Sequence, residues 1–308
     1  MTNTTASAVI LNTVTLINTF ITSFICLVIL ITLVCRVALR KDVHLLLCTN
    51  TYVAILAYSL ASGSLYIDAL RGDVQMFADG LNDSLMCQIR GSVVLALLSA
   101  IFGAFCLLAF FRLCRIVHRQ KQFFQQYHIQ FIFVIFKWLL SFTFVWFVKI
   151  EYLPSEYYCS IPFNTLKPVL LASIIAYGFP STVIAVIYIR ISSYIHYHRL
   201  IMATQRRTRR DFLTIQRTMF IVSILWLLGI PSMVLLVYGQ VHRGSIHPLT
   251  YRIQWITPSF AFCVLSLVLI KFDSRLSSIL ARRQVVHMKL RDMKVSQHNQ
   301  NRRLRNKS

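Results

Sequence analysis

One stretch, residues 87–119, constrains the fold of this chain more than any other. It begins at Cys87 and continues with 21 residues, Gly91 to Phe111, that carry no charge. Three arginines then follow within eight residues: Arg112, Arg115 and Arg119. As an α-helix, the uncharged part crosses a hydrocarbon core of about 30 Å. The pattern predicts a transmembrane helix with an oxidising end at the cysteine and a cytoplasmic end at the arginines.

The composition is that of a membrane protein. Of the 308 residues, 56% are hydrophobic and only 14% are charged, whereas about a quarter of the residues in a soluble domain are charged. Six further apolar segments have the length of a membrane span: residues 9–35, 45–67, 129–148, 168–189, 218–241 and 253–270. Lys137 interrupts the third of these, and we expect its amine to reach toward the inner membrane surface. The predicted fold is an all-α bundle of seven transmembrane helices.

The distribution of charge predicts the orientation of the bundle. With the N-terminus outside, 26 of the 32 lysines and arginines fall in cytoplasmic segments, as the positive-inside rule requires. The net charge of +22 is therefore expected to face the anionic inner leaflet of a lipid bilayer, not nucleic acid. The segment 206–210, rich in arginine, is interpreted in the same way. We expect a multi-pass protein of the plasma membrane.

Four parts follow from this topology. Residues 1–8 form an extracellular N-terminus without a basic region or cleavage site, and residues 9–272 form the seven-span domain. In residues 273–284, Leu276, Ile279 and Leu280 share one helical face with cations opposite, which is typical of a short amphipathic helix on the membrane surface. Residues 285–308 form a basic cytoplasmic tail.

The eight cysteines separate into two groups by this topology. Only Cys87 and Cys159 lie on the outer, oxidising side. A disulfide between them would tie the start of the third span to the loop between the fourth and fifth spans; the alternative is two free thiols. Sequons at Asn3 and Asn82 lie on the outer side and are expected to carry glycans, whereas Asn306 lies inside.

Several motifs match the pattern of a known family. Arg112 follows Cys87 by 25 residues, and Ile116-Val117-His118 comes soon after it. A proline in the fifth span, Pro180, precedes Tyr188 by eight residues. Trp138 and Pro231 match a fourth-span tryptophan and a sixth-span proline. With seven spans and the outer cysteine pair, residues 9–283 resemble the rhodopsin-like (class A) G-protein-coupled receptors, as a divergent member.

The resemblance implies a receptor that transmits an extracellular ligand signal to a heterotrimeric G protein by opening its cytoplasmic face. Arg112, Tyr188 and Pro231 would then serve coupling and activation. Phe111 replaces the acid that precedes the arginine in the family, so Asp211, twenty residues before Pro231, is a candidate resting-state partner of Arg112. The alternative is that Asp211 pairs with Arg207 on its own helix.

The resemblance also places a ligand pocket, which has little polar content. Its expected lining is Val94, Leu98, Trp226, Ser232, Met233 and Trp255. Such a lining suits a hydrophobic small molecule or a peptide. No amine-anchoring acid, second-span aspartate, retinal-binding lysine or seventh-span Asn-Pro-x-x-Tyr stands at the matching positions, and no cofactor is expected.

Other function classes have less support. The sequence holds no HExxH, GxSxG, GxGxxG or CxxC motif, so an enzyme is not expected. A transporter or channel would usually carry ionisable residues within its spans and an internal repeat, and neither pattern is evident. A receptor-shaped protein without signalling function remains an alternative because the seventh-span motif is missing.

Overall fold

The computed structural model describes most of the apolar part of the chain. The described residues are 3–40, 42–75, 85–117, 122–148, 150–153, 157–162, 166–199, a few single residues between 223 and 238, and 249–272. Their helices are α1 (Asn3–Arg40), α2 (Val43–Gln75), α3 (Leu85–Ile116), η1 (Gln122–Gln125), α4 (Tyr127–Val145), α5 (Leu166–Ser173), η2 (Ile174–Gly178), α6 (Phe179–Arg199) and α8 (Thr250–Phe272). The two short strands are β1 (Glu151–Leu153) and β2 (Tyr158–Ser160).

Within the described part of the chain, six helical segments are long and apolar enough to cross a membrane, and they correspond to six of the seven predicted spans. The remaining predicted span, residues 218–241, lies outside the described residues apart from a few helical ones, and so does the predicted amphipathic helix 273–284. The chain divides into two compact units, residues 1–266 and 267–308. Helices α1 to α6, the two strands and most of α8 belong to the first unit.

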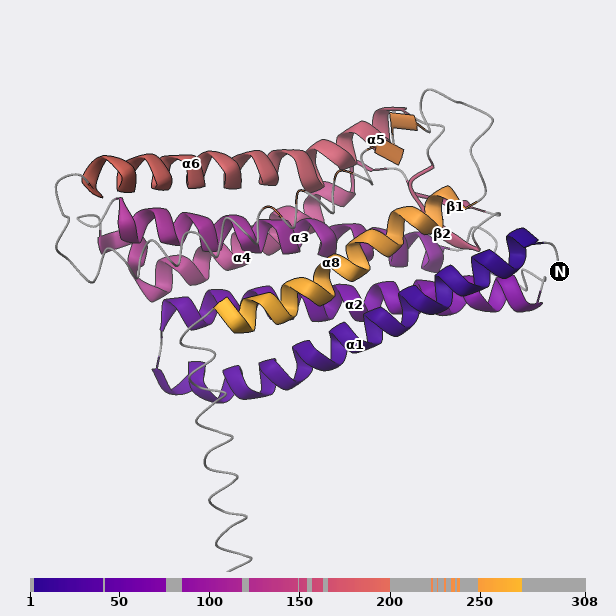
Figure 1. Cartoon of the computed structure of the whole chain (residues 1–308), viewed down its shortest axis with the longest axis horizontal. Helices are drawn as coiled ribbons and strands as arrows, with labels where there is room; N and C mark the ends of the chain where they lie inside the picture. The colour runs from indigo at the N-terminus through magenta and orange to yellow at the C-terminus, as the bar shows by residue number, and fades with distance from the viewer. Residues whose placement is uncertain are drawn as a thin grey trace, which may run out of the picture. The chain divides into compact units, whose positions relative to one another are not determined.

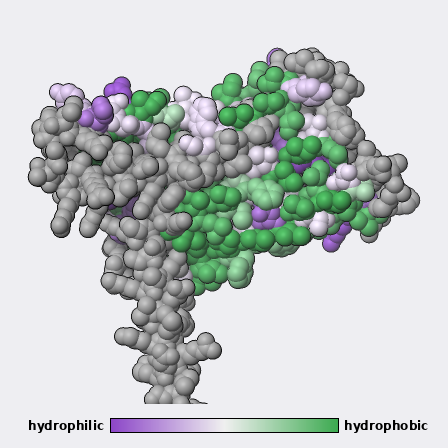
Figure 2. All heavy atoms as spheres, viewed as in Figure 1, coloured by the Kyte–Doolittle hydropathy of each residue, from purple (hydrophilic) through white to green (hydrophobic). Residues whose placement is uncertain are grey.

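The face of α1 that packs on α2 repeats at alternating intervals of three and four residues. Its buried members are Asn12, Thr15, Thr19, Thr22, Cys26, Ile29 and Leu33. This spacing forms one stripe along a helix. The threonines bond to carbonyls of their own helix, Thr22 to Asn18 at 2.8 Å for example, so small, satisfied side chains let the two helices approach closely. The opposite face exposes Ile17, Phe20 and Phe24 as a lipid-facing helix does, and Figure 2 shows hydrophobic residues over much of this side.

The centre of the bundle is α3. It packs against α2, α4, α6 and the hairpin β1–β2 (Figure 1). Two-thirds of its apolar window is buried, more than in any other described span. An apolar helix buried on most of its circumference is what a core position requires. The segment that constrains the sequence most therefore also occupies the middle of the fold.

The fifth span is continuous but changes its winding. The α5, η2 and α6 segments together make one candidate span, and η2 is a π-helical turn two residues before Pro180. Proline lacks the N–H that a regular helix would use here, and π-turns accommodate such breaks. Next to the break, the Cys106 thiol of α3 donates to the Pro180 carbonyl at 3.4 Å, and Phe102 meets the Tyr177 ring edge-on at 5.2 Å.

The second span is longer than the sequence predicted. The predicted span ends at Ile67, which would leave Asp68 and Asp73 in the loop that follows, but α2 continues to Gln75. Each acid has a cation from another helix. Arg90 of α3 lies 2.6 Å from Asp68, and Arg252 of α8 lies 2.6 Å from Asp73. Because these partners compensate the charges, the helix extends through both residues.

Candidate functional site

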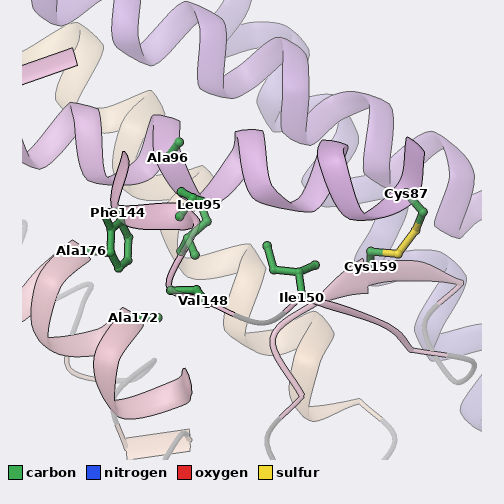
Figure 3. Close-up of a cluster of buried hydrophobic side chains, with 10 residues drawn as sticks. Cys87, Leu95, Ala96, Phe144, Val148, Ile150, Cys159, Ala172 and Ala176 are labelled. Carbon is green, nitrogen blue, oxygen red and sulfur yellow. A yellow bond between two sulfur atoms is a disulfide. The ribbon is translucent and has the colours of Figure 1, made fainter. Parts of the chain in front are cut away.

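The end of α3 that carries Cys87 is covered by the β1–β2 hairpin. The antiparallel strands pair Tyr152 with Cys159, and a disulfide joins Cys159 to Cys87. This is the pair that the topology singled out. Beneath it, Leu95, Phe144 and Ile150 belong to a buried hydrophobic cluster that links α3, α4 and the fifth span (Figure 3). Burial raises the pKa of the Tyr152 phenol on β1, and the neighbouring Tyr157 adds to this shift.

Two glycines let the hairpin lie directly on the helices. A Cβ at Gly91 of α3 would stand 2.7 Å from the Cys159 carbonyl oxygen and 3.0 Å from a methyl group of Ile150. A Cβ at Gly72 of α2 would overlap the ring of Tyr157, whose φ of 59° lies in the left-handed region. Larger residues at these two positions would push the hairpin outward.

Gly91→Ala is expected to destabilise the protein by about 1–3 kcal/mol through overpacking against the backbone of Cys159. Thermal unfolding of the detergent-solubilised chain measures the effect. The matched control is Gly63→Ala in α2, where the nearest atom to an added Cβ is Thr19 Oγ1 at 3.9 Å, an ordinary contact. Equal melting temperatures for the two variants would contradict the prediction.

The expected ligand-pocket residues are only partly described. Val94 is buried in α3, and Leu98, one turn further on, is half-buried. Trp226 is 42% exposed, and its carbonyl accepts a hydrogen bond from the Tyr177 hydroxyl at 3.4 Å. Trp255 of α8 has a buried indole Nε1 that finds no acceptor among the described residues. Ser232 and Met233 lie outside the described residues.

A separate groove lies between the N-terminal end of α3, the C-terminal end of α4 and strand β1. Its volume is about 880 Å³. It is lined mainly by apolar side chains such as Ile89, Phe142 and Trp146, with Glu151 and Tyr152 at its edge. Of the expected ligand-pocket residues that the structure describes, Val94, Leu98, Trp226 and Trp255, none lines this groove.

A lysine is buried in the interior of the bundle, which the sequence did not predict. Lys137 of α4 was expected to reach toward the membrane surface, but it is only 7% exposed. Its Nζ lies 3.3 Å from Asn50 Oδ1 on α2, 3.3 Å from the Ala100 carbonyl on α3, and 4.0 Å above the Trp138 ring. A charged group inside a membrane either reaches the surface or, as Lys137 does here, lies buried beside hydrogen-bond acceptors.

The same acceptor also serves Trp138, the tryptophan at the family's fourth-span position. Trp138 Nε1 donates to Asn50 Oδ1 at 2.9 Å. Gly103 of α3 leaves room for the lysine stem, because a Cβ there would lie 2.8 Å from Lys137 Cγ. One amide oxygen thus joins α2 and α4, and the lysine stem crosses α3 at a glycine.

The arginine-rich end of α3 holds the expected coupling residue. Arg112 is half-buried, and its Nε and Nη1 atoms are buried without a hydrogen-bond partner among the described residues. Phe111, which replaces an acid, packs with Leu47 of α2 and Val134 of α4 in an apolar cluster. Tyr188 of α6 is almost fully buried. Asp211 and Pro231 lie outside the described residues, so the pairing of Arg112 with Asp211 stays a prediction.

Comparison with known proteins finds a similar fold but no similar sequence among family models or curated proteins. No family model and no curated protein matches the sequence. The fold is similar to the crystal structure of squid rhodopsin, with a TM-score of 0.76 over 90% of this chain and 85% of that chain, at 14% sequence identity. This similarity confirms the rhodopsin-like G-protein-coupled receptor fold that the sequence predicted, and at this identity it shows the fold alone.

Sequence reasoning missed two polar sites in the bundle. The Lys137 site and the Asp73–Arg252 ion pair join residues that are 87 and 179 positions apart in the chain. The one available signal for Lys137 was its position within an apolar run, since ionisable residues inside a span mark functional or interhelical contacts by default.

Proposed function

We propose that this chain is a G-protein-coupled receptor of the plasma membrane that passes an extracellular signal to a heterotrimeric G protein. The observation that carries the proposal is Arg112. Two of its guanidinium nitrogens are buried without a partner among the described residues, at the cation-rich end of the central helix of a rhodopsin-like fold. A buried donor without an acceptor costs free energy, so it favours states in which a partner arrives. A G-protein segment that enters an opened cytoplasmic face would supply that partner.

The extracellular ligand is proposed to bind among α3, the sixth span and α8, near Val94, Leu98 and Trp255. The buried Trp255 indole N–H supports a ligand that brings a hydrogen-bond acceptor together with an apolar body, since Trp can only donate. A hydrophobic small molecule and a peptide both meet this description. Neither a cofactor nor a metal has a role in the proposal.

Nucleotide exchange on a co-expressed heterotrimeric G protein tests the proposal directly. Membranes that contain the chain should load a non-hydrolysable GTP analogue faster than matched membranes without it, over a panel of Gα subtypes. Uptake of labelled solutes without any exchange would favour a transporter instead. Neither activity, with the protein verified at the cell surface, would favour a receptor-like protein that does not signal.

The proposed orientation has its own test in the sequons. Asn3, which begins α1, and Asn82 are expected to carry glycans because both face the lumen during synthesis, whereas Asn306 should remain bare. Endoglycosidase treatment of Asn3→Gln, Asn82→Gln and Asn306→Gln variants, read as gel shifts, checks this. A glycan on Asn306 would reverse the topology.

A resting-state latch between Arg112 and Asp211 is proposed to hold the cytoplasmic face closed. Phe111 lies in the apolar cluster with Leu47 and Val134 and carries no charge for its neighbour, which supports a partner from elsewhere in the chain. A partly exposed ion pair is worth up to about 1 kcal/mol, which is roughly a fivefold shift between two states.

Asp211→Asn is therefore expected to raise ligand-free nucleotide exchange several-fold. Arg207→Gln is the matched control, because Arg207 can pair with Asp211 four residues along a helix without holding Arg112. Exchange is measured per receptor at the cell surface. If both variants raise exchange equally, or if Asp211→Asn leaves it unchanged, the latch does not exist.

A further inference from the structure

Three polar positions on α8 repeat at intervals of seven residues: Arg252, Ser259 and Ser266. Seven residues is close to two helical turns, so the three positions share one face of the helix. Arg252 and Ser259 make buried hydrogen bonds to α1 or α2 through their side chains, and Ser266 makes one through its backbone carbonyl. We call these contacts the polar seam; its partners on α1 and α2 are Asn12, Asn18, Tyr52 and Asp73.

The outermost contact of the seam joins three helices. Arg252 Nη1 donates to Asp73 Oδ2 at 2.6 Å, and Nη2 donates to Oδ1 at 2.8 Å, a bidentate pair. Asn12 of α1 donates a further hydrogen bond to Asp73 Oδ2 at 2.8 Å. The side chains of Arg252 and Asp73 are 5% and 3% exposed. Separating them would leave both charges buried, which is far more costly than losing an exposed pair.

The two inner contacts involve neutral groups. Asn18 Nδ2 of α1 donates to Ser259 Oγ at 3.2 Å, and that hydroxyl donates in turn to the Ile256 carbonyl at 2.8 Å. The Tyr52 hydroxyl of α2 donates to the Ser266 carbonyl at 3.1 Å. These contacts keep the polar groups of the seam satisfied away from water.

We propose that the polar seam fixes the axial position of residues 252–266 on α1 and α2, with Asp73 and Arg252 as its positioning residues. A slip of α8 by one turn would break all three contacts together. It would also leave the charges of Arg252 and Asp73 buried without each other. The seam holds this register whether or not the chain signals. If the chain signals as proposed above, residues 252–266 keep this register on α1 and α2 in the resting and active states.

Disulfide crosslinking between α1 and α8 measures the axial register of α8. Asn18→Cys is combined with Ser259→Cys in the full chain, with the native thiols Cys26 and Cys263 replaced by alanine. Oxidation in membranes, followed by cleavage between the spans, shows whether the two helices are joined. We expect efficient crosslinking in this parent, loss of most of the crosslinked product with Asp73→Asn, and recovery with the charge exchange Asp73→Arg and Arg252→Asp.

A second thiol pair reports a slip. Native Cys263 follows Ser259 by one turn on α8, so Asn18→Cys with Cys263 retained and Cys26→Ala should crosslink little in the parent and more with Asp73→Asn. Crosslinking of Asn18→Cys to Ser259→Cys that is unchanged by Asp73→Asn would overturn the proposal. If Asp73→Asn does not reach the membrane, the charge exchange decides: recovery of the folded, crosslinked chain supports the seam, and failure to recover overturns it.

Discussion

Arg112→Ala is expected to reduce nucleotide exchange to the level of the G protein alone, while the chain still reaches the cell surface. Arg112 leaves two buried nitrogens without a partner among the described residues, so the substitution breaks no hydrogen bond of these two atoms there. In the proposed active state the same nitrogens meet the G protein. The substitution therefore removes the proposed contact with the G protein, and with it the proposed pair with Asp211, while the described packing of α3 stays unchanged. Exchange normalised to surface antibody binding measures the effect.

Arg115→Ala is the matched control for this prediction. Arg115 lies on the same helix three residues further on, carries the same charge, and is exposed. Loss of a cation near the membrane surface costs about 1 kcal/mol of attraction to anionic lipid in either variant. Exchange should therefore survive in Arg115→Ala. Full signalling by well-expressed Arg112→Ala would remove the main support for the proposed function.

The second large effect is expected at Gly103, deep in the bundle. Gly103→Leu would place four new carbon atoms where the stem of Lys137 crosses α3, since even a Cβ would lie 2.8 Å from Lys137 Cγ and 3.1 Å from Cδ. Close packing leaves no adjacent space to absorb them. We expect a destabilisation of about 3 kcal/mol or more and a strong loss of folded protein at the surface.

A compensating substitution makes this prediction specific. Lys137→Ala removes four heavy atoms from the same place, so the double variant restores the volume across the α3–α4 contact. Trp138 Nε1 still satisfies Asn50 Oδ1, and the buried cation is gone. The double variant should therefore recover most of the thermal stability that Gly103→Leu loses. Additive losses would show that the two positions do not share a space.

The approximate location of each described span along the chain was predictable from the sequence. It depends on the average hydropathy and charge of a long segment, not on any single contact. Uncharged length located the spans, and the run between Cys87 and Arg112 indicated the helix that proves central. The disulfide partners followed from the predicted topology, which places the other cysteines within spans or near the cytoplasmic face. Such inferences need no knowledge of which residues touch.

The specific contacts were not predictable for the opposite reason. Asp73 and Arg252 are 179 residues apart, and each looked like an ordinary loop charge beside a span. Lys137 interrupts an apolar run in which half of the residues are exposed on the surface of the bundle, so nothing local showed that its own side faces Asn50. Gly103 and Gly91 matter only because another segment lies against them. Sequence periodicity identifies the buried face of a helix but not the segment that packs against it.

The polar seam also has a consequence for how the chain is made. Asp73 is synthesised 179 residues before Arg252, which is an interval of roughly ten to forty seconds at ordinary translation rates. During that time Asn12 is in place, but the guanidinium that neutralises Asp73 does not yet exist. The nascent chain thus carries an uncompensated acid at the edge of the bilayer until its last span arrives.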